Sequence, residues 1–214
     1  MRSAALTLVL LVGSARGLTI PEHGTYIPSM GAFACRGYPL GAKVDEALGH
    51  HGGTIRIRDG IREIRFDLEE FSPVLDKAAL EATRTALYEG YLAQNTMPLL
   101  RSASPDAELL EAKAVTLEKP RSLSGLPAYQ SAVLMAKQGA VRGQIQYSDG
   151  RFMYTVSHFA RVKEGWPKEK QIAAAYAQLL IGLSWCQFPR TDTGPHVYPT
   201  APEGRYAGKP AARP

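Results

Sequence analysis

Two alternating runs of apolar and polar residues open the best-patterned part of the chain. Residues 54–58 alternate at period two, and residues 61–68 resume the alternation after Asp59-Gly60. An Asp-Gly pair between two alternating runs is the strongest short-range signal for a β-hairpin. The large apolar residues of the second run share one side of a strand, so we expect one face of the hairpin to be buried.

Two other stretches repeat their apolar residues at the helical spacing. In the first, Ser72 can cap the helix and Pro73 suits its first position, and the apolar stripe then continues until the helix ends within residues 90–95. The second opens at Pro167, carries its stripe as far as Leu183 and is closed by Trp185 and Cys186, before Phe188-Pro189 ends it. We therefore predict two helices.

Strand-like runs fill most of the chain between the two helices. One run covers residues 109–118, and three more cover 130–137, 141–147 and 151–159, separated by glycine-containing turns. Short runs joined by tight turns predict an antiparallel meander. The order of hairpin, helix, strand, meander and helix predicts an α+β fold, in which helices pack on one or both faces of an antiparallel sheet.

The ends of the chain differ from this patterned region. Residues 18–50 are rich in Gly, Pro and small residues without a sustained period, which predicts an irregular N-terminal arm. Residues 189–214 are rich in Pro and Gly and poor in apolar residues, which predicts a disordered tail. A single α+β domain is expected between them, over residues 51–188.

Residues 1–17 have the plan of a secretory signal peptide. Arg2 precedes a short apolar run over residues 4–12, and small residues follow over 13–17. This apolar run is too short to span a bilayer, and no later stretch approaches the length a spanning helix needs. We expect the signal to be cleaved and the protein to be secreted or periplasmic, with no transmembrane segment in the mature chain.

The chain has two cysteines, Cys35 and Cys186. In an oxidising compartment the simplest expectation is one disulfide between them. Two unpaired thiols are one alternative. A reactive thiol beside His50, His51 or His158 is another, and it would make the protein a thiol-dependent enzyme.

The patterned region resembles PsbP/Mog1-like domains over residues 53–186. The resemblance rests on the hairpin segment 64–67, the turn 125–129, the meander segment 148–154 and the helix end 183–185. It implies an α-β-α sandwich. Domains of this group mostly act as accessory, assembly or binding factors rather than as enzymes, and several are exported.

Charge offers one candidate binding site. Lys and Arg number 25 against 20 Asp and Glu, a net charge of +5 that includes Arg2 and Arg16 of the expected signal, so a nucleic-acid partner is not predicted. Four hairpin arginines could converge to bind an anion or an acidic partner: Arg56, Arg58, Arg62 and Arg65. Asp59, Glu63 and Asp67 are interleaved with them and could instead neutralise the group.

Catalytic and metal-binding motifs are weak by comparison. His50-His51 lies among glycines that permit a bend, but no metal-ligand spacing accompanies it. No G-x-S-x-G or phosphate-binding glycine loop occurs, so we predict no catalytic residue, metal or cofactor. Seven aromatic residues are expected to pack in the core or, alternatively, to line a ligand cleft between sheet and helix: Tyr147, Phe152, Tyr154, Phe159, Trp166, Tyr176 and Trp185.

The sequence therefore predicts an exported, non-catalytic binding or accessory protein of the bacterial envelope or extracellular space. Its partner would be a protein or a small ligand. A thiol-dependent enzyme that uses Cys35 with a histidine is the first alternative. A carrier of a small molecule or metal is the second.

Overall fold

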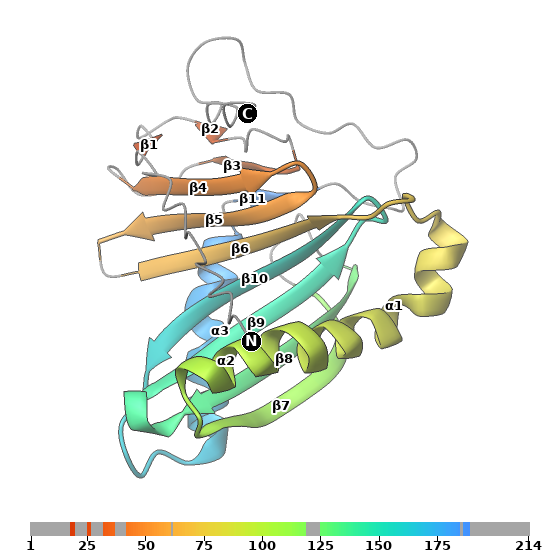
Figure 1. Ribbon diagram of the computed structural model, residues 1–214. Coiled ribbons are helices and arrows are strands. Elements are labelled where there is room, and N and C mark those ends of the chain that lie inside the picture. Colours follow the sequence, from red (N-terminus) through yellow and green to blue (C-terminus); the bar gives the residue numbers. More distant parts are fainter. Residues whose placement is uncertain are drawn as a thin grey trace, which may run out of the picture.

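A large antiparallel sheet forms the centre of the protein (Figure 1). The computed structural model describes residues 18–19, 25–26, 32–36, 42–60, 62–118, 125–184 and 186–188. Eight strands form the large sheet in the order β1-β4-β5-β6-β10-β9-β8-β7, and three form a small sheet in the order β11-β3-β2. The α+β class with an antiparallel sheet is confirmed.

The strands and helices have the following bounds. The strands are β1 (Leu18–Thr19), β2 (Thr25–Tyr26), β3 (Ala34–Arg36), β4 (Lys43–Gly49), β5 (Gly52–Asp59), β6 (Arg62–Glu70), β7 (Ala107–Thr116), β8 (Pro127–Met135), β9 (Ala140–Ser148), β10 (Phe152–Arg161) and β11 (Cys186–Gln187). The helices are α1 (Lys77–Tyr91), the π-helix η1 (Leu92–Thr96), α2 (Met97–Ala103), the 3-10 turn η3 (Ala136–Gln138) and α3 (Lys168–Leu183).

The predicted hairpin and meander are both present. β5 and β6 pair in antiparallel register with Asp59 opposite Arg62 at the turn, where Gly60 adopts φ +54°. β7, β8, β9 and β10 pair in sequence order as one meander. The predicted second helix is α3, which begins after Pro167. It ends at Leu183, before its predicted close at Trp185 and Cys186, because Cys186 belongs to β11 and pairs with Cys35 on β3.

The connection between the hairpin and the meander determines which elements cover the sheet. β6 pairs with β10, the last strand of the meander, so the chain must cross from β6 to β7 at the far edge. It makes this crossing as α1, η1 and α2, which pass over the front of the sheet in Figure 1, whereas α3 lies behind it. Helices therefore cover both faces.

The first helix begins later than its predicted start at Pro73. The Leu75 N–H donates to the Gly150 carbonyl at 2.8 Å, which holds this segment against the turn between β9 and β10. The helix begins only after Asp76, whose carboxylate accepts a hydrogen bond from the Ala79 N–H at 2.7 Å. A cap of this kind satisfies one of the free N–H groups at a helix start.

The same helix also continues past its predicted end within residues 90–95. The turn η1 widens to the π type, in which the Met97 N–H donates to the Leu92 carbonyl, and α2 follows without a break. Pro98 explains the wider turn, since a proline in a regular α-helix clashes with the carbonyl four residues earlier. The prediction was wrong because it treated the end of the apolar stripe as the end of the helix.

The prediction of an irregular arm over residues 18–50 is wrong for the strands that lie within it. β4 pairs with β5 along its length, with Val44 opposite Ile57, and β3 pairs with both β2 and β11. β4 has one buried side chain, so its strand conformation comes from pairing rather than from its own pattern. The predicted signal peptide (1–17) and tail (189–214) lie outside the described residues.

The main hydrophobic core lies between the sheet and α3, and it extends under the small sheet. Phe33 stacks on Phe66 with ring centroids 4.8 Å apart and on Phe188 at 5.2 Å. Beside them Cys35 and Cys186 form a disulfide with an S–S distance of 2.06 Å, as predicted. In the described part of the chain, no helix is both long and apolar enough to cross a membrane.

Candidate functional site

The front face of the sheet carries both a second, smaller apolar cluster, which packs against the crossing helices, and two rows of polar residues. Directly paired residues form one row across four strands: Asp67 on β6, Thr155 on β10, Gln146 on β9 and Tyr129 on β8. Thr155 and Gln146 are 1% and 0% exposed. Sheet faces under helices are ordinarily apolar, so this row requires an explanation.

A second polar row lies two residues further along the same strands, on the same face of the sheet. Arg65 on β6, Ser157 on β10, Gln144 on β9 and Ser131 on β8 are paired in register. The side chains of Ser157, Gln144 and Ser131 are buried.

Several polar atoms of these two rows have no hydrogen-bond partner among the described residues. They are both amide atoms of Gln146, Nε2 of Gln144, and the hydroxyls of Ser131, Thr155 and Ser157. An unpaired buried polar atom costs about 1–3 kcal/mol. The face therefore carries polarity that the fold itself does not use.

The π-turn brings the other wall of the site over these rows. Tyr91, Asn95 and Thr96 line a cleft between helix and sheet whose volume is about 480 Å³. Its sheet wall includes Thr54, Arg65, Asp67, Arg142 and Thr155. We call this space the helix–sheet cleft. π-turns inside α-helices occur frequently at functional sites, because the extra residue redirects neighbouring side chains.

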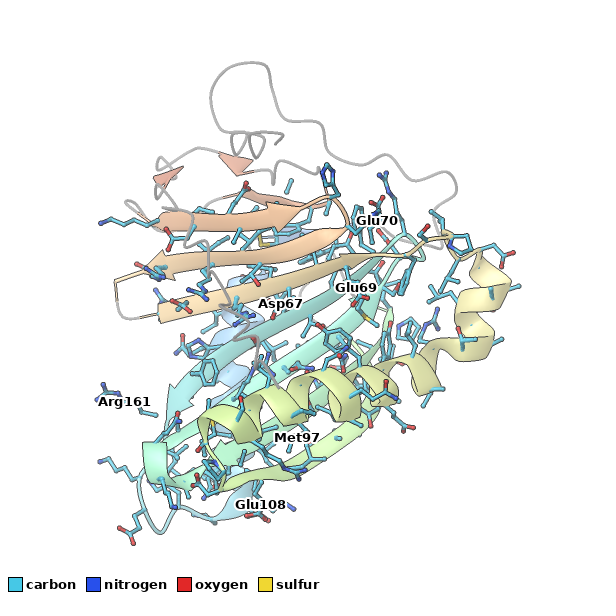
Figure 2. All side chains as sticks on the ribbon, viewed as in Figure 1. Asp67, Glu69, Glu70, Met97, Glu108 and Arg161 are labelled. Carbon is cyan, nitrogen blue, oxygen red and sulfur yellow. A yellow bond between two sulfur atoms is a disulfide. The ribbon has the colours of Figure 1, made fainter. Side chains whose placement is uncertain are left out.

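A hydrogen-bonded group holds one end of the cleft. The Arg65 guanidinium donates from Nε to both Asp67 carboxylate oxygens, at 2.8 and 2.9 Å. Thr54 Oγ1 donates to Asp67 Oδ1 at 2.7 Å. Figure 2 shows Asp67 and Glu69 along β6, on the side of the sheet where the helix carrying Met97 lies. The Asp67 carboxylate is thus already neutralised by Arg65.

Arg142 occupies the cleft wall on β9, and its side chain is almost fully enclosed, with 6% of the residue exposed. It donates a hydrogen bond to Gln144 Oε1, which also accepts one from the Thr96 hydroxyl at 3.4 Å. Burial lowers the pKa of Arg142 to about 10, against the opposing effect of Asp67. The guanidinium therefore keeps its charge at neutral pH.

Tyr91, which lines the cleft, and Tyr88, on the same helix, stay protonated at neutral pH. Burial raises the pKa of Tyr91, and the charge of Asp67 raises it further. Burial raises the pKa of Tyr88 to about 12. Both phenols are therefore hydrogen-bond donors rather than nucleophiles under ordinary conditions.

The structure places most of the predicted arginine cluster in ion pairs. Arg65 alone of the four lines the helix–sheet cleft, and Arg56 is exposed without an ion pair among the described residues. The other arginines bind the interleaved acids. These ion pairs are Arg58 with Asp45 (3.0 Å) and Glu63 (2.7 Å), Arg62 with Asp59, and Arg65 with Asp67 (2.8 Å).

The predicted cysteine and histidine alternatives do not assemble into a site. Cys35 and Cys186 are bonded to each other, so neither offers a free thiol. Nδ1 of His158 lies 2.8 Å from the Glu63 carbonyl, on the α3 side of the sheet, whereas His51 lines the rim of the cleft. Among the described residues, no three side chains of the metal-ligating types gather into a group.

The predicted aromatic residues on the meander divide between the two faces. Tyr147, Phe152 and Tyr154 are buried in the main core, and Tyr147 stacks on Tyr154 at 5.6 Å. Phe159 is 45% exposed and points to the other face, where Arg142 Cζ lies 6.0 Å from its ring centroid. Core packing is thus confirmed for the first three, and the helix–sheet cleft is lined mainly by other residues.

Comparisons with protein-family models and with curated proteins find no match to this chain. The site must therefore be interpreted from its own residues. Sequence reasoning missed Arg142, Gln144 and Gln146, which alternate with the apolar residues of β9. That alternation predicts a strand with one solvent-exposed face, and it does not indicate that a helix covers this face.

Proposed function

We propose that this protein is an exported, non-catalytic binding protein that holds a small polar ligand in the helix–sheet cleft. The observation that carries the proposal is the polar lining of the cleft, in which the nearly fully buried Arg142 and Thr155 of the sheet lie together with Tyr91, Asn95 and Thr96 of the helix. Ligand sites place a few convergent polar groups in a concave space of about 300–1,000 Å³. The cleft falls in this range at about 480 Å³.

A binding role is supported over the two alternatives by the state of the candidate chemical groups. A thiol-dependent enzyme needs a thiolate, and Cys35 is held in a disulfide. A metal carrier needs several ligating side chains around one point, and His51, Asp67 and Glu69 line the cleft without gathering into such a group among the described residues, whereas the cleft also offers threonines, an asparagine and arginines. These are groups that bind organic ligands through hydrogen bonds.

The proposed location and family follow from other features. The disulfide between Cys35 and Cys186 indicates an oxidising compartment outside the cytoplasm, which supports the predicted export. An antiparallel sheet between helices is the arrangement that the resemblance to PsbP/Mog1-like domains implies, and it supports our proposal of that fold. Function does not follow from fold alone, so the cleft carries the proposal.

Two tryptophan substitutions in the same π-turn test the proposal. Asn95→Trp places an indole at the mouth of the cleft, whereas Ala93→Trp adds the same exposed side chain away from the cleft lining. Wild type and both variants are screened by thermal shift against sugars, amino acids, organic acids and nucleotides. Hits are then measured by isothermal titration calorimetry.

We expect the wild type and Ala93→Trp to bind the same ligand with similar affinity, and Asn95→Trp to lose at least tenfold. Unchanged binding by Asn95→Trp would place the ligand elsewhere. Equal loss in both variants would show that the π-turn, rather than the cleft, is disturbed. Either result contradicts the proposal.

A further inference from the structure

Among the side chains of the helix–sheet cleft, Arg142 is the one whose burial costs the most free energy. A charged group that is nearly fully buried is stable only when an opposite charge or several hydrogen bonds compensate it. Among the described residues, no carboxylate lies within ion-pair distance of Arg142, and its hydrogen bond goes to the neutral amide of Gln144. Arg142 is also one of the residues that line the cleft.

The nearest acid does not supply the missing charge. Asp67 attracts Arg142 electrostatically, but its two carboxylate oxygens already accept hydrogen bonds from Arg65 and Thr54. Glu69 also lines the cleft, and its side chain is exposed at the rim. The cleft thus holds the half-buried Asp67 carboxylate, which is already bound to Arg65, and the exposed Glu69 carboxylate, and neither lies within ion-pair distance of the buried Arg142 guanidinium.

We infer that the ligand of the helix–sheet cleft is a small organic oxoanion, and that Arg142 binds its carboxylate or phosphate group. This inference rests on the proposed function and specifies its ligand class. A guanidinium presents parallel N–H donors that match two oxygens of a carboxylate or phosphate, and such bonds are stronger than neutral ones. Thr96, Asn95 and Thr155 then supply hydrogen bonds to the remainder of the ligand.

The side chains that contact Arg142 fit this assignment. Gln144 fixes the guanidinium from one side through Oε1, so the plane of the donors is set before the ligand arrives. Phe159 approaches from another side, with Arg142 Cζ 6.0 Å from its ring centroid. A positioned, partly desolvated donor loses little entropy on binding, which raises affinity. Without a bound anion, the same burial makes the charge of Arg142 destabilising to the fold.

Matched arginine variants test the inference. Arg142→Gln removes the charge from the cleft, and Arg56→Gln removes an equal charge from an exposed position on the same sheet face. The probes are succinate and citrate as carboxylates, inorganic phosphate and glycerol 3-phosphate as phosphates, and glycerol as an uncharged control. Binding to the full chain with its disulfide intact is measured by isothermal titration calorimetry and thermal shift.

We expect the wild type to bind at least one carboxylate or phosphate probe and to ignore glycerol. Arg142→Gln should lose tenfold or more in affinity while Arg56→Gln stays within twofold, because exposed charges are screened by salt. The two pairs of probes decide which oxoanion is preferred. If Arg142→Gln does not fold, Arg142→Lys keeps the charge without the paired donors and should still lose affinity about tenfold.

Three results would overturn the inference. One is an absence of binding of every anion to the wild type at millimolar concentration. Another is full affinity in Arg142→Gln or Arg142→Lys, and the third is an equal loss in Arg56→Gln. If Arg142→Gln keeps an uncharged ligand that Asn95→Trp excludes, the proposed binding function stands and only the oxoanion assignment fails.

Discussion

The two faces of the large sheet are built from alternate residues of the same strands, and the larger apolar cluster lies toward α3, whereas the face toward α1 and α2 combines a smaller apolar cluster with buried polar residues. Toward α3, β6 presents Ile64 and Phe66, and β10 presents Tyr154 and Val156, all packed in one apolar core. Toward α1 and α2, the residues between them on the same strands are polar. One of these, Thr155, is as buried as the core residues.

Under the proposed function, this difference assigns stability mainly to one face and ligand binding to the other. Burial of apolar surface, most of it toward α3 and less of it under α1 and α2, supplies the favourable free energy of folding. Burial of unpaired amides, hydroxyls and a guanidinium on the opposite face lowers stability, and such groups are expected where a ligand completes their hydrogen bonds. The substitutions below test this separation, from the largest expected effect to the smallest.

The largest effect should come from the aromatic centre of the α3 face. Phe66 is fully buried and stacks on Phe33, so Phe66→Ala should lower the free energy of unfolding by about 3–5 kcal/mol. Urea denaturation followed by circular dichroism measures this. Val74→Ala, at a position 60% exposed, is the control and should change stability by less than about 0.5 kcal/mol. Equal effects would contradict the assignment of the core.

The disulfide on the same face should contribute almost as much to the free energy of unfolding. Cys35→Ser combined with Cys186→Ser removes a covalent link between residues 151 positions apart, and we expect a loss of about 2–5 kcal/mol. Reductant should destabilise the wild type by a similar amount and leave the double variant unchanged. A response of the double variant to reductant would show that the effect does not come from this bond.

A smaller effect is expected where α3 touches the sheet most closely. A Cβ atom at Gly143 would lie 2.1 Å from the Ala175 carbonyl oxygen, so Gly143→Ala must displace α3 and should cost about 1–3 kcal/mol. Gly90 in α1 has open space around it, and Gly90→Ala should stabilise by about 0.5–1 kcal/mol. Thermal unfolding distinguishes the two signs, and a stable Gly143→Ala would argue against this close packing.

The polar face should respond in the opposite direction. Gln146→Leu removes a fully buried amide that has no partner among the described residues, and we expect stability to rise by about 1 kcal/mol. Gln144→Leu is the matched comparison. It removes an acceptor that Arg142 and Thr96 use, so it should lower stability. A marked loss in Gln146→Leu would mean that its amide contributes to the stability of the fold.

The sequence predicted the hairpin, the meander, α3 and the disulfide, because local alternation, turn residues and cysteine count specify them. It did not predict β4, whose strand conformation depends on its pairing with β5. The cleft was also missed, because polar residues on β9 alternate in the same way whether water or a helix covers them. What covers them is decided by the path of the chain from β6 to β7, a long-range property of topology.

The link between Cys35 and Cys186 also has a topological consequence. It closes a covalent ring that contains β4 to α3, and therefore every strand of the large sheet except β1. A single proteolytic cut inside this ring opens the backbone without releasing a fragment. Nicked molecules should therefore migrate as one species in electrophoresis until reductant separates them, and both walls of the cleft stay tethered after such a cut.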